Sequence, residues 1–372
     1  MKMKNRISIL IICLFTLILY SCSKTKSADP PLPKERKEAV IVAANNSTLI
    51  SYDANKGTKL WEAVLSGNCK GTPVLYQKKV YVHTDNAMLY AINVIDGKIE
   101  KSLSTSFMSS PFAIAQYGDK LYFASDKLYC IDTAFNPVWE YDGGVACSSS
   151  PQFYNDKIYV AMGDKINCVD LSGNNVWQSA AVGAGIITSS VKVIADVVYF
   201  GAQDKKIYAL NANNGAINWY YTTLDKVESS PMVYGGMCII GGSDYNLYCL
   251  DIIDGSLRWK YHTLERVVSS PTVHSSTNTI IVGSYDFNLY GIDHVSGKLK
   301  WKYPAASLIK SSPVVMGNLS YFTSYDKYLY CIDCRDGSLV WKVFLNANSE
   351  GSPIVDNTRT GLYSSESGMS EY

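Results

Sequence analysis

The chain has 372 residues, of which 47% are hydrophobic and 18% charged, and its formal net charge at pH 7 is +1. This composition excludes a disordered or collagen-like chain, and the near balance of acidic and basic side chains argues against a nucleic-acid partner. The one long apolar run, residues 7–20, follows three basic residues and is too short for a typical membrane span. It predicts a signal peptide, and we expect no transmembrane segment elsewhere.

The end of this apolar run resembles the lipoprotein signal of bacteria. Leu19-Tyr20-Ser21-Cys22 places an apolar and a small residue before a cysteine, and the resemblance implies a signal peptide at 1–21 and lipidation of Cys22. Ordinary signal cleavage with an incidental Cys22 is the alternative. Residues 22–38 are polar and proline-rich, which predicts a flexible tether to a folded domain at 39–372. Ser23 is not the aspartate that retains many such lipoproteins in the inner membrane, so we expect an outer-membrane lipoprotein facing the periplasm.

From about Ala39 onward the sequence repeats itself roughly every 40 residues. A Ser-Ser-Pro motif, or a near variant of it, ends at Pro73, Pro111, Pro151, Val191, Pro231, Pro271, Pro313 and Pro353. All seven tryptophans fall at one position of the repeat, and Lys101 takes that position in the remaining unit. Eight repeat units follow from this register.

Each unit predicts four short antiparallel strands, most clearly at 313–316, 320–323, 328–333 and 338–344. An aspartate-containing turn lies between the second and third strands, and an Asp-Gly or Asn-Gly type turn follows the third. Proline has no N–H to donate, so its recurrence in the first strand indicates an edge strand facing a central channel. The sequence therefore predicts an all-β, eight-bladed propeller.

The two ends of the repeat region predict how the ring closes. Too few residues follow Pro353 to form a whole unit, whereas Ala39–Ala44, Leu49–Asp53 and Lys59–Leu65 match strands two to four of the other units. A blade shared by both chain ends would leave no open sheet edge. Leu362–Ser365 also matches a second strand and competes with Ala39–Ala44 for that place.

With Ser229-Ser230-Pro231, Tyr248-Cys249-Leu250-Asp251, Asp254-Gly255 and Trp259, the unit resembles the repeat of pyrroloquinoline-quinone-type propellers. The resemblance implies that the repeated tryptophan docks between adjacent blades. The residues concerned are Trp61, Trp139, Trp177, Trp219, Trp259, Trp301 and Trp341. Quinoprotein dehydrogenases and non-enzymatic proteins share this fold, and the propeller lipoproteins of the outer-membrane β-barrel assembly machinery are similar in architecture.

The chemistry of a quinoprotein dehydrogenase is not evident in the residues. That group carries a vicinal cysteine pair and a calcium-binding cluster, but no two cysteines here are adjacent, and the four histidines share no ligand-like spacing. The repeated turn aspartates, Asp204, Asp244, Asp286 and Asp326, are expected to bond their own backbone. We therefore expect no catalysis, no metal and no cofactor.

The cysteines are expected to be free. Cys130, Cys168, Cys249 and Cys331 share one third-strand position that is otherwise filled by small residues, which is typical of cysteine acting as a small buried hydrophobe. Cys331 and Cys334 form a Cys-x-x-Cys, but this spacing at a strand predicts side chains on opposite faces. A redox function is not expected from them.

Residues that the repeat does not dictate are candidates for partner selection, because identical structural positions tolerate different side chains there. Three residues before the end of each motif the side chains vary, and the candidate partner-binding rim consists of Lys70, Met108, Glu228, Lys310 and Glu350. Lys310, Glu350 and Lys70 form an arc of alternating charge across the closure, with a surface ion triplet of small energetic value as the alternative.

The predicted function is a non-catalytic, lipid-anchored propeller scaffold that binds another protein of the bacterial envelope, with outer-membrane protein assembly as the expected process. A dehydrogenase-like enzyme and a glycan-binding propeller are the alternatives. For glycan binding, the candidate exposed rings are Tyr220, Tyr221, Tyr245, Tyr285 and Tyr325, which do not follow the phase of the other repeated tyrosines.

Overall fold

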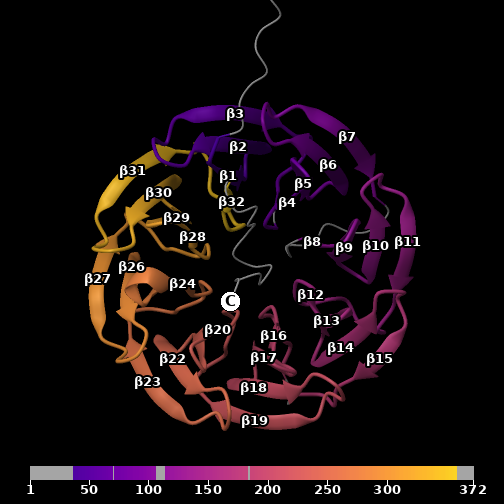
Figure 1. Cartoon of the computed structure of the whole chain (residues 1–372), viewed down its shortest axis with the longest axis vertical. Coiled ribbons are helices and arrows are strands. Elements are labelled where there is room, and N and C mark those ends of the chain that lie inside the picture. The colour runs from indigo at the N-terminus through magenta and orange to yellow at the C-terminus, as the bar shows by residue number, and fades with distance from the viewer. Residues whose placement is uncertain (1–36, 70, 106–113, 183–184, 358–372) are drawn as a thin grey trace, which may run out of the picture. The chain divides into compact units, whose positions relative to one another are not determined.

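The computed structural model describes residues 37–69, 71–105, 114–182 and 185–357. The predictions for the signal peptide, Cys22, Lys70 and Met108 lie outside these residues. The described residues belong to one compact unit, Glu35–Tyr372. They form eight four-stranded antiparallel sheets arranged like blades around a central axis (Figure 1), so the predicted eight-bladed propeller is confirmed.

We number the blades 1 to 8 along the chain and give their strands from the axis outward. Blade 1 contains β32 (Ile354–Asp356), β1 (Ala39–Ala44), β2 (Thr48–Asp53) and β3 (Lys59–Val64), and blade 2 contains β4 (Val74–Tyr76), β5 (Lys79–His83), β6 (Met88–Asn93) and β7 (Ile99–Ser104). Blade 3 contains β8 (Ala115–Tyr117), β9 (Lys120–Ala124), β10 (Leu128–Asp132) and β11 (Pro137–Tyr141), and blade 4 contains β12 (Gln152–Tyr154), β13 (Lys157–Met162), β14 (Lys165–Asp170) and β15 (Asn175–Gln178).

Blade 5 contains β16 (Lys192–Ile194), β17 (Val197–Ala202), β18 (Lys206–Asn211) and β19 (Ile217–Thr222), and blade 6 contains β20 (Met232–Tyr234), β21 (Met237–Gly241), β22 (Asn246–Asp251) and β23 (Leu257–His262). Blade 7 contains β24 (Thr272–His274), β25 (Thr279–Gly283), β26 (Asn288–Asp293) and β27 (Leu299–Pro304), with a 3-10 turn, η1 (Ser275–Thr277), after β24. Blade 8 contains β28 (Val314–Met316), β29 (Leu319–Ser324), β30 (Tyr328–Asp333) and β31 (Leu339–Phe344).

How deeply a strand is buried depends on its position within the blade. The third strands are buried on both faces, as in β22, because each sheet packs against a neighbour on either side. The outermost strands expose alternate residues, as in β23, because only one of their faces meets another blade. The core therefore consists of apolar layers between adjacent blades, such as the layer that joins Cys249 and Trp259 of blade 6 to Ile280 and Tyr290 of blade 7.

The innermost strands are shorter than the sequence indicates. The motif proline precedes the strand, so that Pro313 lies outside β28. The first strands of neighbouring blades contact one another around the axis, as β24, β28 and β32 do. The expectation that the first strand is the channel-facing edge of each blade is confirmed. One detail is corrected: the proline directly precedes the strand and is not part of its pairing.

The ring closes through a blade built from both ends of the described chain. β1 pairs with β2 on one side and with β32 on the other, where Ala39 lies opposite Asp356 and Ile41 opposite Ile354. Ala39–Ala44 therefore supplies the second strand of blade 1, while the competing segment Leu362–Ser365 lies outside the described residues.

Each tryptophan joins its blade to the next one. The indole N–H of Trp219 donates to the carbonyl oxygen of Ile252, 3.1 Å away, and its ring lies so close to Gly255 that a Cβ there would come within 2.5 Å of it. Gly255 has a φ of +73°, so this turn requires glycine for its conformation and for the close approach of the ring. Trp341 makes the corresponding bond to Ala54 O and links blade 8 to blade 1.

The junction between blades 2 and 3 lacks the tryptophan found at the other seven junctions. Lys101 replaces the tryptophan, and its ammonium donates to Ala134 O and lies 5.3 Å from the centroid of the Phe135 ring. Phe135 occupies the left-handed turn position that glycine holds in other blades, with a φ of +65°. Its ring is buried against Tyr81, at a centroid distance of 6.1 Å. The aromatic ring at this junction thus comes from the following blade.

Candidate functional site: the channel mouth and its rim

The Ser-Ser-Pro motif forms the mouth of the central channel. The hydroxyl of the first serine accepts the N–H of the adjacent second strand, as Ser229 Oγ does from Gly241 at 3.1 Å. The second serine links blades, because its N–H donates to the hydroxyl oxygen of the second serine in the next blade. We call this series the serine belt. It comprises Ser150, Ser190, Ser230, Ser270, Ser312, Ser352 and Thr72, with N···O distances of 2.9 to 3.4 Å.

The serine belt was not foreseen from the sequence, where the motif served only to mark the first strand. The signal was present in the second serine, which Thr72 replaces with another hydroxyl in blade 2. A backbone N–H near the axis of the ring needs an acceptor, and a hydroxyl from the neighbouring blade supplies it.

A cavity of about 410 Å³ lies at this mouth. Its wall combines belt serines with residues from the connections that lead from one blade to the next. Among the latter are Lys226, Glu228, Arg266, Val268, Lys310 and Glu350, with Tyr285 and Thr188 completing the described wall. Of the predicted rim, Glu228, Lys310 and Glu350 are thus brought together on one cavity, whereas Lys70 and Met108 lie outside the described residues.

The charged groups of the cavity differ in their partners. Glu228 pairs with Lys226 at 2.9 Å and accepts the Ser243 hydroxyl at 3.2 Å, and Glu350 accepts the amide of Asn45 at 3.1 Å. Within the described part of the chain Lys310 forms no ion pair, and Lys70, the third member of the predicted arc, lies outside it, so the ion triplet stays a prediction. Lys226 also lines the cavity, although it was not among the predicted rim residues.

The sequence also did not single out Arg266, because it lies two residues before Val268, the variable position of its repeat. Its guanidinium lies over the Tyr285 ring, 4.8 Å from the centroid, a favourable cation–π arrangement. Burial raises the pKa of Tyr285, and the nearby Arg266 opposes that rise. Tyr285 is therefore engaged with a cation. Of the five tyrosines considered for glycan binding, only Tyr220 and Tyr245 are exposed.

Outside the cavity, the same face carries exposed apolar side chains on turns of blades 6 and 7 and on the connections that lead into these blades. Leu224 and Leu264 are 75% and 77% exposed, and the neighbouring turns present Tyr245 and Phe287. Hydrogen bonds hold the connections against the turns that carry these rings: Leu224 N–H donates to Asp244 Oδ2 and Leu264 N–H to Asp286 Oδ2, each at 2.9 Å, and Thr263 N–H donates to Tyr245 O at 2.8 Å. We call Leu224, Tyr245, Leu264 and Phe287 the apolar row.

The equivalent positions of some other blades carry different residues. Ala306 takes the place of the leucine after blade 7, and Lys205 and Lys327 take the place of the turn aromatics in blades 5 and 8. Tyr245 and Phe287 have φ angles of +69° and +73°, a region that bulky residues rarely adopt. Lys205 and Lys327 share this conformation, at +68° and +70°, so it belongs to the repeated turn. The exposed rings mark these positions as candidates for a binding role.

The turn aspartates do more than bond their own backbone. Asp244 accepts the hydroxyl of Tyr248 at 2.5 Å as well as the N–H of Leu224. Asp286 and Asp326 make the same contacts with Tyr290 and Tyr330. These carboxylates thus hold the incoming connection against the blade. Among the described residues, no group of three or more His, Cys, Asp and Glu side chains is placed to hold a metal ion.

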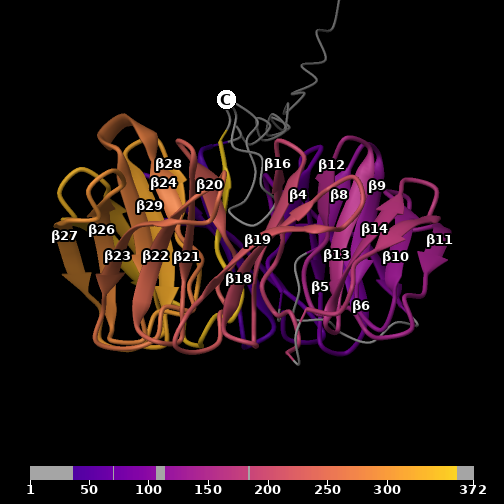
Figure 2. The same cartoon turned by 90° about the horizontal axis from the view of Figure 1, so that it is seen from below.

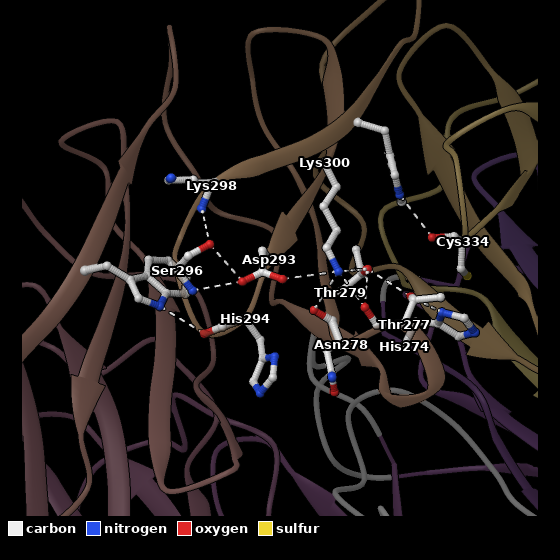
Figure 3. Close-up of polar contacts among 12 residues, drawn as sticks. His274, Thr277, Asn278, Thr279, Asp293, His294, Ser296, Lys298, Lys300 and Cys334 are labelled. Carbon is white, nitrogen blue, oxygen red and sulfur yellow. Dashed lines mark hydrogen bonds and ion pairs between the residues drawn. The ribbon is translucent and has the colours of Figure 1, made fainter.

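The polar groups on the opposite face do not form a catalytic triad. Figure 3 shows the junction of blades 7 and 8, where Lys300 pairs with Asp293 at 3.3 Å and donates to the Thr277 carbonyl oxygen. Nearby, the exposed Ser276 hydroxyl lies 2.8 Å from His274 Nε2, but Nδ1 of that ring faces the Thr277 hydroxyl at 2.6 Å. The carboxylate that orients a catalytic histidine is thus replaced by a hydroxyl.

The described cysteines are free and buried, as expected, and Cys331 and Cys334 lie in different core layers. Burial raises the pKa of Cys249 to about 12. The residues at the channel mouth also do not fit a quinone and calcium: the chain has no vicinal cysteine pair, and the one aromatic ring of the cavity wall, Tyr285, is covered by Arg266. The described residues contain no helix long and apolar enough to cross a membrane.

The radial four-stranded blades, the Trp–Gly docking and the serine belt define an eight-bladed propeller of the pyrroloquinoline-quinone-like repeat class. A family model described as "Outer membrane protein assembly factor BamB" matches residues 23–133 and 163–313, and the chain belongs to this family.

Known proteins show the same likeness. A curated relative, the outer membrane protein assembly factor BamB of Moranella endobia (strain PCIT), is 24% identical over an alignment of 207 residues, and the match covers 50% of this chain and 52% of the relative. The chain thus spans about half the length of that relative. The crystal structure of BamB from Moraxella catarrhalis superposes with a TM-score of 0.66 at 16% identity, covering 82% of this chain and 91% of that one.

The fold is shared more widely. A quinohemoprotein alcohol dehydrogenase from Pseudomonas putida HK5 superposes with a TM-score of 0.67 at 12% identity, covering 82% of this chain and 70% of that chain. At this identity the likeness concerns the fold alone, and fold does not fix activity.

Proposed function

We propose that the protein is a non-catalytic scaffold of the bacterial envelope that acts in outer-membrane protein assembly by binding a partner protein. Membership of the BamB family supports this role. The observation that carries it is the apolar row, because exposed leucines and aromatics gathered on one sector are typical of protein-binding surfaces.

The proposed docking face extends from the apolar row inward to the rim. Lys70, Met108, Glu228, Lys310 and Glu350 form its inner border in this proposal, where charge selects among partners. Leu224 and Leu264 form the apolar centre, which contributes most of the binding energy.

The test is a crosslinking pull-down from envelope membranes with the double variant Leu224→Ser/Leu264→Ser. The matched control is Ile253→Ser/Val295→Ser, two residues of the same sector that are 85% and 68% exposed on turns at the opposite ends of the strands. We expect the wild type and the control to capture the same outer-membrane assembly protein and the double variant to lose most of it. Equal capture by all three would refute the docking face.

We further propose that residues 1–21 are a signal peptide, that Cys22 carries lipid and that residues 22–38 tether the propeller to the outer membrane on the periplasmic side. Lipid chains on a cysteine bind a bilayer by burying methylene groups. Cys22→Ala should release the protein from membranes under a high-salt wash, as measured by fractionation. Retention of the variant in the membrane fraction would contradict the anchor.

A dehydrogenase-like enzyme is the alternative function, because such enzymes share this fold. Adding pyrroloquinoline quinone and calcium should leave the melting temperature unchanged if the proposed function is right, because the channel mouth does not present the groups that such an enzyme needs. A glycan array tests the other alternative, and hits that depend on Tyr220 would favour it.

A further inference from the structure

The cavity at the channel mouth contains two cationic side chains that lack an acidic partner. Lys310 and Arg266 come from consecutive connections, and both are half-buried on the cavity wall. Within the described residues Lys310 has neither an ion pair nor a hydrogen bond, and the Arg266 guanidinium contacts only the face of Tyr285. Half-buried cations without an acidic partner are available to bind an anionic group of a ligand.

Among the described residues, neither acid of the same cavity forms an ion pair with Arg266 or Lys310. Glu228 is engaged by Lys226 at 2.9 Å and by the Ser243 hydroxyl. Glu350 is engaged by the side-chain amide of Asn45. The wall thus carries three cationic side chains, Lys226, Arg266 and Lys310, against two carboxylates, so positive charge is in excess.

The hydroxyls around the cavity add donors. Ser190, Ser230 and Ser270 use their oxygen atoms to accept belt N–H groups, and in the described chain none of them donates its O–H to another protein group. Thr188 Oγ1 belongs to the same wall, is buried and has no hydrogen-bond partner among the described residues. Guanidinium and ammonium groups only donate, so the ligand that satisfies this set is an acceptor.

We propose that the channel mouth binds a small organic anion whose carboxylate or phosphate oxygens are held by Arg266, Lys310 and the belt hydroxyls. The cavity, at about 410 Å³, is of the size that holds a small molecule and exceeds the needs of a single inorganic ion. Oxyanions with several oxygens match a planar guanidinium, a point charge and scattered hydroxyls at once. This site goes beyond the scaffold role and does not depend on the apolar row.

Isothermal titration calorimetry at low ionic strength tests the site with citrate and orthophosphate as probes. The variants are Arg266→Gln and Lys310→Gln, and the matched control is Lys302→Gln, an exposed lysine on the outermost strand of blade 7. We expect each cavity variant to weaken binding at least about tenfold, whereas the control binds like the wild type. Tighter binding of citrate assigns the natural ligand to carboxylates, and tighter binding of orthophosphate assigns it to phosphates.

Glu228→Gln supplies a second test that removes no donor. Because it withdraws negative charge from the wall, it should tighten binding of the same probe. The proposal is overturned if neither probe binds the folded wild type, if the cavity variants bind as well as the wild type, or if Lys302→Gln weakens binding equally. Arg266 belongs to neither the predicted rim nor the apolar row, so partner capture by Arg266→Gln separates a failure of this site from a failure of the scaffold role.

Discussion

Tryptophan docking is the residue-scale contact that most clearly connects sequence with stability. Trp259 donates to His294 O at 2.9 Å and lies against Gly297 of the next blade. Replacing it with alanine removes a large buried ring and a hydrogen bond, so we expect a loss of about 3–5 kcal/mol in the free energy of unfolding. Urea denaturation monitored by circular dichroism measures this loss.

The exceptional junction refines that prediction. Lys101→Ala should cost about 1 kcal/mol or less, since its ammonium is exposed, whereas Phe135→Ala should approach the cost of Trp259→Ala because the buried ring is Phe135. A large loss for Lys101→Ala together with a small one for Phe135→Ala would contradict this division. The repeat register revealed the missing tryptophan, but not its replacement, because Phe135 belongs to a different blade and a different repeat position.

His83 predicts how stability depends on pH. Burial lowers its pKa to about 4, below the ordinary value of 6.5. Between these two values the unfolded chain binds a proton that the folded chain does not, so stability falls as the pH decreases from about 6.5 to about 4 and levels off below. Denaturation at several pH values should show this slope, and His83→Gln should reduce it. An unchanged slope in the variant would assign it to other groups.

Among the elements, the innermost strands depend on side chains more than on sheet pairing. They are only three residues long, and the serine belt joins each to the next blade. The sequence predicted their place and their edge character from the proline. It did not predict their length, because the motif serines that precede them use their hydroxyls in contacts between blades that no single strand pattern encodes.

Ser230→Ala tests the belt. It removes the acceptor of the Ser190 N–H, 2.9 Å away, and leaves that donor unsatisfied near the channel, so we expect a loss of about 1–2 kcal/mol in the free energy of unfolding. Ser230→Thr should preserve stability, since Thr72 fills the same role in blade 2. Ser256→Ala, in an exposed turn, is the control. Equal stability of Ser230→Ala and the control would show that water replaces the belt.

The connections between blades show where sequence reasoning ends for the candidate site. Glu228, Lys310 and Glu350, which the variable repeat position singled out, line one cavity because equivalent repeat positions lie at equivalent radii, while their role in partner binding stays a prediction. The repeat pattern did not identify Arg266, because its long side chain reaches the cavity from two residues away. It did not identify Leu264, because the exposure of that side chain depends on how the connection bends. Such features arise from tertiary packing and not from the repeat period.

At the scale of the whole molecule, closure through blade 1 determines whether the ring is one cooperative unit. β32 covers the inner edge of β1, and Ile354 is fully buried in the layer between blades 1 and 2. Without β32 the edge of β1 would be left unpaired, and an unpaired edge invites association with another chain. In Figure 2 the yellow end of the ribbon runs within the ring beside blades whose colours come from the start of the chain.

Two truncations test this closure. A chain that ends at Asn357 retains β32 and should keep the melting temperature and the association state of the full chain. A chain that ends at Pro353 lacks β32, exposes the edge of β1 and should melt at a lower temperature and self-associate on size-exclusion chromatography. If ending the chain at Asn357 were as damaging as ending it at Pro353, the segment around Leu362–Ser365 would be needed for the closing blade, and the pairing of β1 with β32 would not be sufficient to close the ring.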